Sequence, residues 1–221
     1  MDSLNQMYTM LKINEIFYSI QGESTYAGLP TVFVRTTGCP LRCTYCDTKY
    51  SYEEGDDYTS EQLFAEIKSH GTKYVCITGG EPLIQKNIYA FMKKLCDLDY
   101  IVSLETSGQI FCDKVDSRVK KVIDIKTPAS GAKDSFDERN LKYQDVNTEF
   151  KFVICNEDDF YWSNDFVAKH LSNAHSPILY SPSFDNHDEK WLAEKILLKK
   201  IKVRLHLQQH KYIWSSTDRG V

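Results

Sequence analysis

Short apolar runs along the chain alternate with segments whose apolar residues recur at helical spacing. A short run of apolar and β-branched residues, bounded by polar or glycine-containing segments, is typical of a buried strand. Such runs predict strands at Thr31–Thr36, Tyr74–Thr78, Ile101–Glu105, Val122–Ile125, Phe150–Ile154, Ile178–Tyr180 and Lys202–Leu207.

Helices are predicted between most of these strands. Thr59 and Gln62 have the spacing of a capping box, which marks the start of a helix. Apolar residues then share one helical face, first at Leu63, Phe64 and Ile67 and later at Ile88, Phe91, Met92 and Leu95. Two more helices are predicted at Asp158–Leu171 and Glu189–Leu198.

Alternation of strands and helices predicts an α/β fold with a parallel sheet and outer helices. About six such repeats are too few for a closed eight-stranded barrel, so we expect a partial, open (β/α) barrel. Residues 1–221 form one domain in this interpretation. The active site of such a fold lies at the carboxyl ends of the strands. Thr127–Thr148 is polar and aperiodic, and predicts a long loop with one short helix, able to act as a lid.

Composition narrows the classes of function. The chain has 221 residues, 42% of them apolar, and a net charge of −4, which gives no electrostatic case for nucleic-acid binding. No apolar run is long enough to span a membrane, and Met1–Met10 lacks the pattern of a secretory signal. We therefore expect a cytoplasmic protein, with reduced thiols.

Cysteines supply the first candidate chemistry. Cys39, Cys43 and Cys46 are spaced CxxxCxxC, so three thiolates can converge on one metal centre. Structural zinc sites and fully ligated iron–sulfur clusters both use four protein ligands, whereas three thiolates on a four-iron cluster leave one iron open. A zinc site completed by Cys76 or His70 is the alternative. Four cysteines lie in apolar contexts and are expected to be buried and inert, namely Cys76, Cys96, Cys112 and Cys155.

The cysteine motif, with aromatic Tyr45 before its last cysteine, resembles the signature of the radical S-adenosylmethionine (SAM) superfamily. Gly79-Gly80-Glu81-Pro82, at the end of a predicted strand, resembles the GGEP motif of that superfamily. The resemblance implies a [4Fe–4S] cluster on the three cysteines and SAM chelated to the open iron. It also implies a 5′-deoxyadenosyl radical that abstracts hydrogen from a substrate. Glu81 or neighbouring carbonyls are expected to accept hydrogen bonds from the SAM ammonium.

Further segments resemble the 7-carboxy-7-deazaguanine synthase (QueE) family in the same order along the chain. They are Glu15–Glu23, Phe33-Val34-Arg35, Cys46-Asp47-Thr48, Glu105–Gly108 and Gln209–Trp214. This family is a radical SAM lyase that rearranges 6-carboxy-5,6,7,8-tetrahydropterin to 7-carboxy-7-deazaguanine with release of ammonia. SAM is regenerated, Mg²⁺ is required, and the product enters queuosine and other 7-deazapurine biosynthesis.

The resemblance also implies roles for individual residues. Substrate is expected at Ile20, Gln21, Gly22, Arg35 and Thr78, SAM at Tyr45, Gly80, Ser107 and Lys126, and Mg²⁺ at Thr48. The family often has Ser-Pro-Lys where this chain has Asp124-Ile125-Lys126, so only the lysine matches there. The sequence assigns no role to His210.

Simpler interpretations stay open for some of these residues. Arg35 could be a surface arginine at a strand end, and Thr48 and Gln21-Gly22 could be ordinary turn residues. Among functions, a glycyl-radical activase acting on a partner protein is the alternative enzyme, and a zinc-binding interaction module is the non-enzymatic one. The family resemblance implies an electron donor such as flavodoxin and a homodimer, while charge and hydropathy predict no nucleic-acid or membrane partner.

Overall fold

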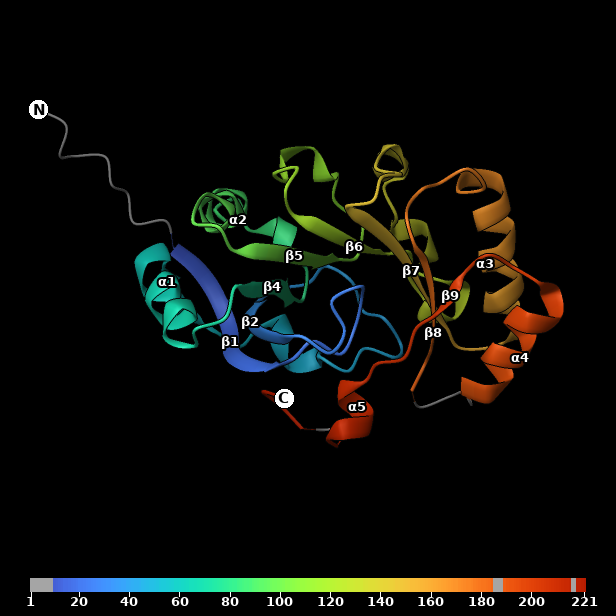
Figure 1. The fold of residues 1–221 in the computed structure, drawn as a ribbon, viewed down its shortest axis with the longest axis horizontal. Helices are drawn as coiled ribbons and strands as arrows, with labels where there is room; N and C mark the ends of the chain where they lie inside the picture. The colour runs from blue at the N-terminus through green and yellow to red at the C-terminus, as the bar shows by residue number, and fades with distance from the viewer. Residues whose placement is uncertain (1–9, 185–188, 216–217) are drawn as a thin grey trace, which may run out of the picture.

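The computed structural model describes residues 10–184, 189–215 and 218–221, and these form a curved, nine-stranded sheet (Figure 1). The strand order is β3-β1-β2-β4-β5-β6-β7-β8-β9. Every pair from β2 to β9 is parallel, whereas β1 pairs antiparallel with β2 and β3. The bounds are β1 Met10–Ile20, β2 Pro30–Thr36, β3 Asp56–Thr59, β4 Tyr74–Gly79, β5 Ile101–Thr106, β6 Lys120–Asp124, β7 Thr148–Ile154, β8 Ile178–Pro182 and β9 Arg204–Leu205.

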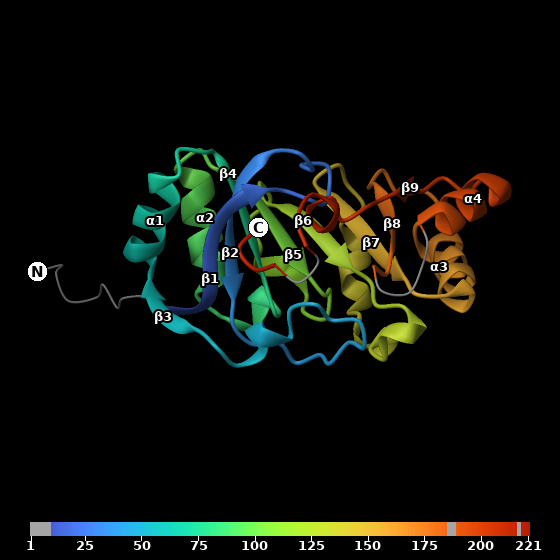
Figure 2. The same ribbon diagram turned by 90° about the horizontal axis from the view of Figure 1, so that it is seen from below.

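The longer helices cover the convex face of the sheet, and the concave face holds the cysteine loop and helix α5 (Figures 1 and 2). The helices are α1 Ser60–Ser69, α2 Ile88–Asp97, α3 Glu157–His170, α4 Glu189–Lys199 and α5 His210–Ile213. The predicted capping box is present, with the Thr59 side chain and the Gln62 side chain each bonded to the other's backbone N–H. Ile88, Phe91, Met92 and Leu95 form the buried face of α2, as predicted.

The partial, open (β/α) barrel is therefore confirmed, and every predicted strand is present. The last one is much shorter than predicted, because only Arg204–Leu205 pairs with β8. Gln209–Trp214 continues from it into α5 instead. Strands β1 and β3 were not predicted at all. β1 contains a bulge between Ile13 and Glu15, and beyond it the buried and exposed positions no longer alternate.

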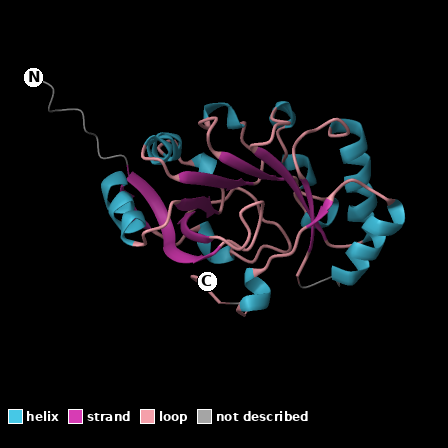
Figure 3. Ribbon diagram, viewed as in Figure 1, coloured by secondary structure: helices cyan, strands magenta, loops and turns pink. Residues whose placement is uncertain are grey.

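The polar stretch 127–148 is a long connection, as predicted, but it holds short 3₁₀ turns in place of one short helix. It contains three 3₁₀ turns, at Pro128–Ser130, Lys133–Ser135 and Glu138–Lys142 (Figure 3). Asn140 anchors it from a fully buried position, because its amide bonds the backbone of Gly108, Ile110 and Cys112. No described residue of 127–148 lines the main cavity, so the expected lid is not found there.

Two expectations concern membranes and export. No helix in the described part of the chain has both the length and the apolar character needed to cross a bilayer. Residues 1–9, on which the prediction about a secretory signal rests, lie outside the described residues.

Candidate active site

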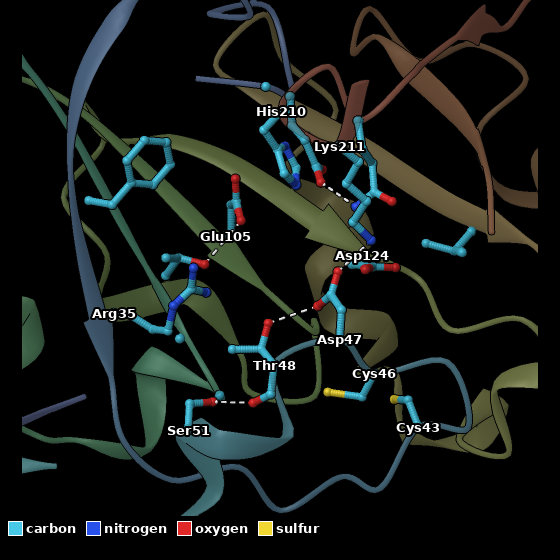
Figure 4. A pocket seen from close by; sticks show the side chains of 18 of the residues that line it. Arg35, Cys43, Cys46, Asp47, Thr48, Ser51, Glu105, Asp124, His210 and Lys211 are labelled. Atoms are coloured by element: carbon cyan, nitrogen blue, oxygen red, sulfur yellow. Dashed lines mark hydrogen bonds and ion pairs between the residues drawn. The ribbon is translucent and has the colours of Figure 1, made fainter. Parts of the chain in front are cut away.

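One cavity of about 580 Å³ lies on the concave side, at the carboxyl ends of the parallel strands. All the site residues predicted from the sequence line it. The strands and the turns that follow them contribute Arg35, Thr78, Gly80, Ser107 and Lys126. The end of β1 and the segment after it contribute Ile20, Gln21 and Gly22. The cysteine loop contributes Cys39, Cys43, Tyr45, Cys46 and Thr48. Figure 4 shows four of these residues around the cavity, namely Arg35, Cys43, Cys46 and Thr48.

The cysteine loop runs from the end of β2 to the 3₁₀ turn Lys49–Tyr52. Its shape is fixed from both sides, since Gly38 N–H donates to the Ser51 carbonyl (2.9 Å) and Thr44 bonds the carbonyls of Ala129 and Ser130. Arg42 donates to the Cys39 carbonyl (2.7 Å) and stacks on the ring of Tyr52.

All three cysteines are free thiols that line the cavity, as three ligands of one cluster must be. Burial raises the pKa of Cys39 and Cys43. A bound metal favours the thiolate form of its cysteine ligands.

The alternative zinc ligands lie elsewhere. His70 caps the carboxyl end of α1, just before β4. It therefore lies at the amino ends of the parallel strands, whereas the cysteine loop lies at their carboxyl ends. Cys76 is fully buried within β4, and neither residue is among the described residues that line the cavity. As predicted, Cys76, Cys96, Cys112 and Cys155 are all buried.

The Gly-Gly-Glu turn packs directly on the cysteine loop. Gly80 N–H donates to the Thr36 carbonyl and Glu81 N–H to the Gly38 carbonyl, at 3.2 and 2.8 Å. A Cβ atom on Gly80 would lie 2.2 Å from the Gly38 carbonyl oxygen and 2.8 Å from Cys39 Cβ. Glycine is therefore required at position 80 by the close approach of the cysteine loop.

Glu81 does not face the cavity. Its carboxylate is fully buried and accepts hydrogen bonds from Leu83 N–H, Thr106 Oγ1 and both the N–H and Oγ of Ser107. These bonds join the end of β4 to the end of β5. Of the two acceptors expected for the SAM ammonium, only the neighbouring carbonyls remain available.

Tyr45, Asp124 and Lys126 form the wall beside the cysteines. Lys126 pairs with Asp124 (Nζ–Oδ2 2.8 Å) and lies over the Tyr45 ring. Burial works against its charge, but Asp124 and Cys43 hold the pKa of Lys126 above its usual value. Tyr45 Oη and Asp124 Oδ1 are buried without a hydrogen-bond partner among the described residues. Buried polar atoms are rarely left unpaired, so this wall fits a polar ligand such as SAM.

The other end of the cavity is built around Arg35. Its Nε donates to Glu15 (2.6 Å), Tyr50 Oη donates to the same oxygen, and the guanidinium lies over the rings of Phe17 and Tyr50. Burial works against the charge of Arg35, but Tyr50 and Glu15 raise its pKa. Among the described residues, no hydrogen bond occupies its two terminal nitrogens, so a fixed fork of donors is offered to the cavity.

Several cavity residues were missed by the sequence analysis. Glu105, at the end of β5, accepts a hydrogen bond from Thr78 (3.0 Å), and burial raises its pKa. Glu23 pairs with Lys151 of β7 and with Gln208. His210 packs its ring against Gly22, where a Cβ atom would lie 2.2 Å from Nδ1. Glu105, Glu23 and His210 all lie in segments that resemble the family, so the resemblance could have marked them as site residues. Lys151 lies in no such segment, and the sequence held no signal for it.

A family model of the radical SAM superfamily matches residues 33–148, which include the cysteine loop, the Gly-Gly-Glu turn and Ser107. The fold and the site thus define a radical SAM enzyme, which implies SAM and a [4Fe–4S] cluster as its cofactors. The 7-carboxy-7-deazaguanine synthase of Chlorobaculum tepidum is 40% identical to this chain over 96% of it and 97% of its own length. The 7-carboxy-7-deazaguanine synthase of Koribacter versatilis is 38% identical to this chain over 96% of this chain and 100% of its own length. The chain belongs to the 7-carboxy-7-deazaguanine synthase family.

Among solved structures, QueE from Escherichia coli is similar to this chain with a TM-score of 0.76 and 24% identity. The match covers 95% of this chain and all of that one, and it confirms the fold.

Proposed function

We propose that this chain converts 6-carboxy-5,6,7,8-tetrahydropterin into 7-carboxy-7-deazaguanine with release of ammonia, as a lyase of queuosine and 7-deazapurine biosynthesis. The observation that carries the proposal is the two-ended cavity, with three free thiols at one end and a fixed arginine fork beside half-buried Glu105 at the other. Sequence identity of 40% over nearly the whole chain to a synthase of that name supports the same reaction.

The cysteine end fits the two cofactors. Cys39, Cys43 and Cys46 would hold the cluster, and the turn at Gly80 with Tyr45, Ser107 and Lys126 would hold SAM. When bound, the two cofactors supply the 5′-deoxyadenosyl radical that abstracts hydrogen from the substrate. The chain's own contribution here is to fix the cysteine loop against the Gly-Gly-Glu turn and to offer unpaired polar atoms on the Tyr45 wall.

The arginine end fits a carboxypterin. The free nitrogens of Arg35 would pair with the substrate carboxylate, which needs a cation once it leaves water. Glu105 is a half-buried acceptor, suited to the N–H groups along the aminopyrimidinone edge of a pterin, and the Thr78 hydroxyl orients it. The backbone at Ile20, Gln21 and Gly22 would contact the same ring.

Thr48 would bind Mg²⁺ through its hydroxyl, together with oxygens of substrate and water. The Thr48 side chain lines the cavity and donates its hydrogen to Asp47 (2.8 Å), so its lone pairs are left for a cation. A flavodoxin-type one-electron donor, a homodimeric assembly and a cytoplasmic location complete the proposal, on the strength of the family resemblance.

The test is anaerobic reconstitution with iron and sulfide, followed by incubation with SAM, a reductant, Mg²⁺ and the carboxypterin. We expect about four irons per chain, carboxydeazaguanine and ammonia as products, and many turnovers per SAM consumed. Alanine at Cys39, Cys43 or Cys46 should abolish the visible absorbance of the cluster, and serine at Cys96 or Cys112 should not.

The alternative enzyme gives the opposite result in this assay. A glycyl-radical activase would consume SAM stoichiometrically and make no deazapurine. Colourless protein with one bound zinc would exclude both enzymes.

A further inference from the structure

Asp47 stands between the residue proposed to bind magnesium and the carboxyl-terminal helix. Its Oδ1 accepts the hydroxyl hydrogen of Thr48 at 2.8 Å, and its Oδ2 lies 2.7 Å from Nζ of Lys211 in α5. Figure 4 shows the three side chains in this order at the edge of the cavity. The sequence assigned no role to either charged residue.

The first contact fixes the direction of a hydroxyl group. A threonine hydroxyl has one hydrogen and two lone pairs. With its hydrogen held by Asp47, Thr48 turns its lone pairs away from the carboxylate, and Thr48 lines the cavity. Groups that orient a metal ligand in this way contribute to metal affinity without touching the metal.

The second contact neutralises the carboxylate. Without a partner, Asp47 would be a stronger ligand for a hard divalent cation than the neutral hydroxyl next to it. The ion pair with Lys211 places a positive charge 2.7 Å from Asp47 Oδ2, so the carboxylate already has a counter-ion within the protein.

Lys211 is held in place rather than being free to move aside. Its side chain is only 10% exposed, and its ammonium lies over the ring of Phe184. The preceding residue, His210, packs on Gly22, and Gln209 N–H donates to the Gly22 carbonyl at 3.0 Å. The ammonium is thus delivered to Asp47 by a segment anchored on the substrate side of the cavity.

We propose that Asp47 is a positioning residue for the Mg²⁺ ligand Thr48, and that Lys211 keeps Asp47 itself out of the metal's coordination shell. The inference rests on the proposed function, in which Mg²⁺ binds beside the pterin. It explains how a site with an exposed aspartate next to its ligand can hold Mg²⁺ through a single neutral protein oxygen. Weak, substrate-dependent binding of the ion follows from that arrangement.

The experiment measures binding of Mn²⁺, a spectroscopic substitute for Mg²⁺, by electron paramagnetic resonance. Reconstituted protein with SAM and carboxypterin is titrated without reductant, so that no turnover occurs. Asp47→Ala should weaken Mn²⁺ binding about tenfold, the usual effect of removing a group that orients a metal ligand. Asp47→Asn keeps an acceptor for the Thr48 hydroxyl and should restore most of the affinity.

Lys211→Met should have the opposite effect, since it frees Asp47 to bind the ion and so tightens Mn²⁺ binding several-fold. The double variant Asp47→Asn with Lys211→Met should lose that gain. Lys93→Met is the matched control, because it removes an ammonium from a 2.7 Å pair with Asp97 on α2 and should change nothing.

The outcomes separate this inference from the proposed function. Thr48→Val should weaken Mn²⁺ binding; unchanged binding would remove the magnesium assignment and this inference with it. Weaker binding in Thr48→Val but no change in Asp47→Ala would overturn the inference alone. So would a Lys211→Met variant that binds Mn²⁺ no tighter than the parent. Cluster absorbance and SAM binding report in each variant that the cysteine loop is intact.

Discussion

Arg35 shows how much of a residue's chemistry depends on its partners. Alone, an arginine at a strand end is as consistent with a solvent-exposed role as with substrate binding. In the fold, Glu15 binds its Nε while Phe17 and Tyr50 flank the guanidinium, so its direction is set before any ligand arrives. Fixing a donor in advance lowers the entropic cost of binding a carboxylate.

Arg35→Ala should therefore weaken binding of carboxypterin by about 2–5 kcal/mol, the usual cost of truncating one partner of a buried charge pair. Arg35→Lys should restore only part of the loss, because an ammonium cannot bind Glu15 and also offer a bidentate fork. Isothermal titration with SAM-loaded protein measures the change. Arg118→Ala, which removes a surface arginine paired with Asp97 and Asp116, is the control. Pterin affinity equal to the parent's would show that Arg35 is structural.

The sequence could predict single residues where a local motif carried them, but not where a contact joins distant segments. The cysteines, Gly80 and Thr48 belong to short motifs, and all of them line the cavity as expected. The Glu23–Lys151 pair joins positions 128 residues apart. A lysine within an apolar strand has no local pattern that identifies its partner, so the buried pair emerges only from the parallel order of the sheet.

At the scale of elements, the apolar runs predicted the parallel strands because both faces of those strands are covered. The same reasoning missed β1, whose bulge interrupts the alternation, and the short strand β3, and it overestimated the length of β9, which is two residues long. The contact between the Gly-Gly-Glu turn and the cysteine loop could not be predicted from the sequence either. Two elements that each resemble a ligand-binding motif turn out to support one another, since Glu81 N–H bonds Gly38 directly.

Gly80→Ala tests that support. A methyl group at this position would meet backbone of the cysteine loop, so the loop must shift and the thiols with it. We expect the variant to fold but to retain much less iron and sulfide per chain after reconstitution and desalting. Gly71→Asn is the control, because nothing lies within 4 Å of a Cβ atom there and asparagine tolerates its positive φ. Normal iron content in Gly80→Ala would mean that the two elements are independent.

At the scale of the molecule, the segment after β1 is held by residues from distant parts of the chain. Thr25 N–H donates to buried Glu149 of β7 at 3.1 Å, and Lys120 of β6 pairs with the same carboxylate. Ser24 N–H donates to Nε2 of His206, just after β9, at 2.8 Å. These contacts hold Gln21 and Gly22 in the cavity, so the pterin end of the site depends on the closure of the whole sheet.

The hydrogen bond between Ser24 and His206 makes the anchoring of the segment after β1 sensitive to pH. Its ring is 5% exposed and accepts a hydrogen bond at Nε2, and burial lowers its pKa although Glu23 acts in the opposite direction. In the unfolded chain a histidine takes up a proton near pH ~6.5. The neutral ring therefore stabilises the fold fully above that pH, and the contribution is lost as the pH falls toward the lower pKa of the folded state. The Glu23 carboxyl, whose pKa is also lowered, responds only at more acidic pH.

The melting temperature should accordingly fall between pH 7.5 and 5.5, the range that brackets the free histidine pKa of about 6.5. His206→Gln keeps a hydrogen-bond acceptor but cannot titrate, so its melting temperature should depend less on pH across that range. Part of the slope should survive, because burial also lowers the pKa of His210. His175→Gln, at an exposed position, should retain the parent's slope. If His206→Gln retained it too, protonation of the His206 ring would not be what loosens the segment after β1.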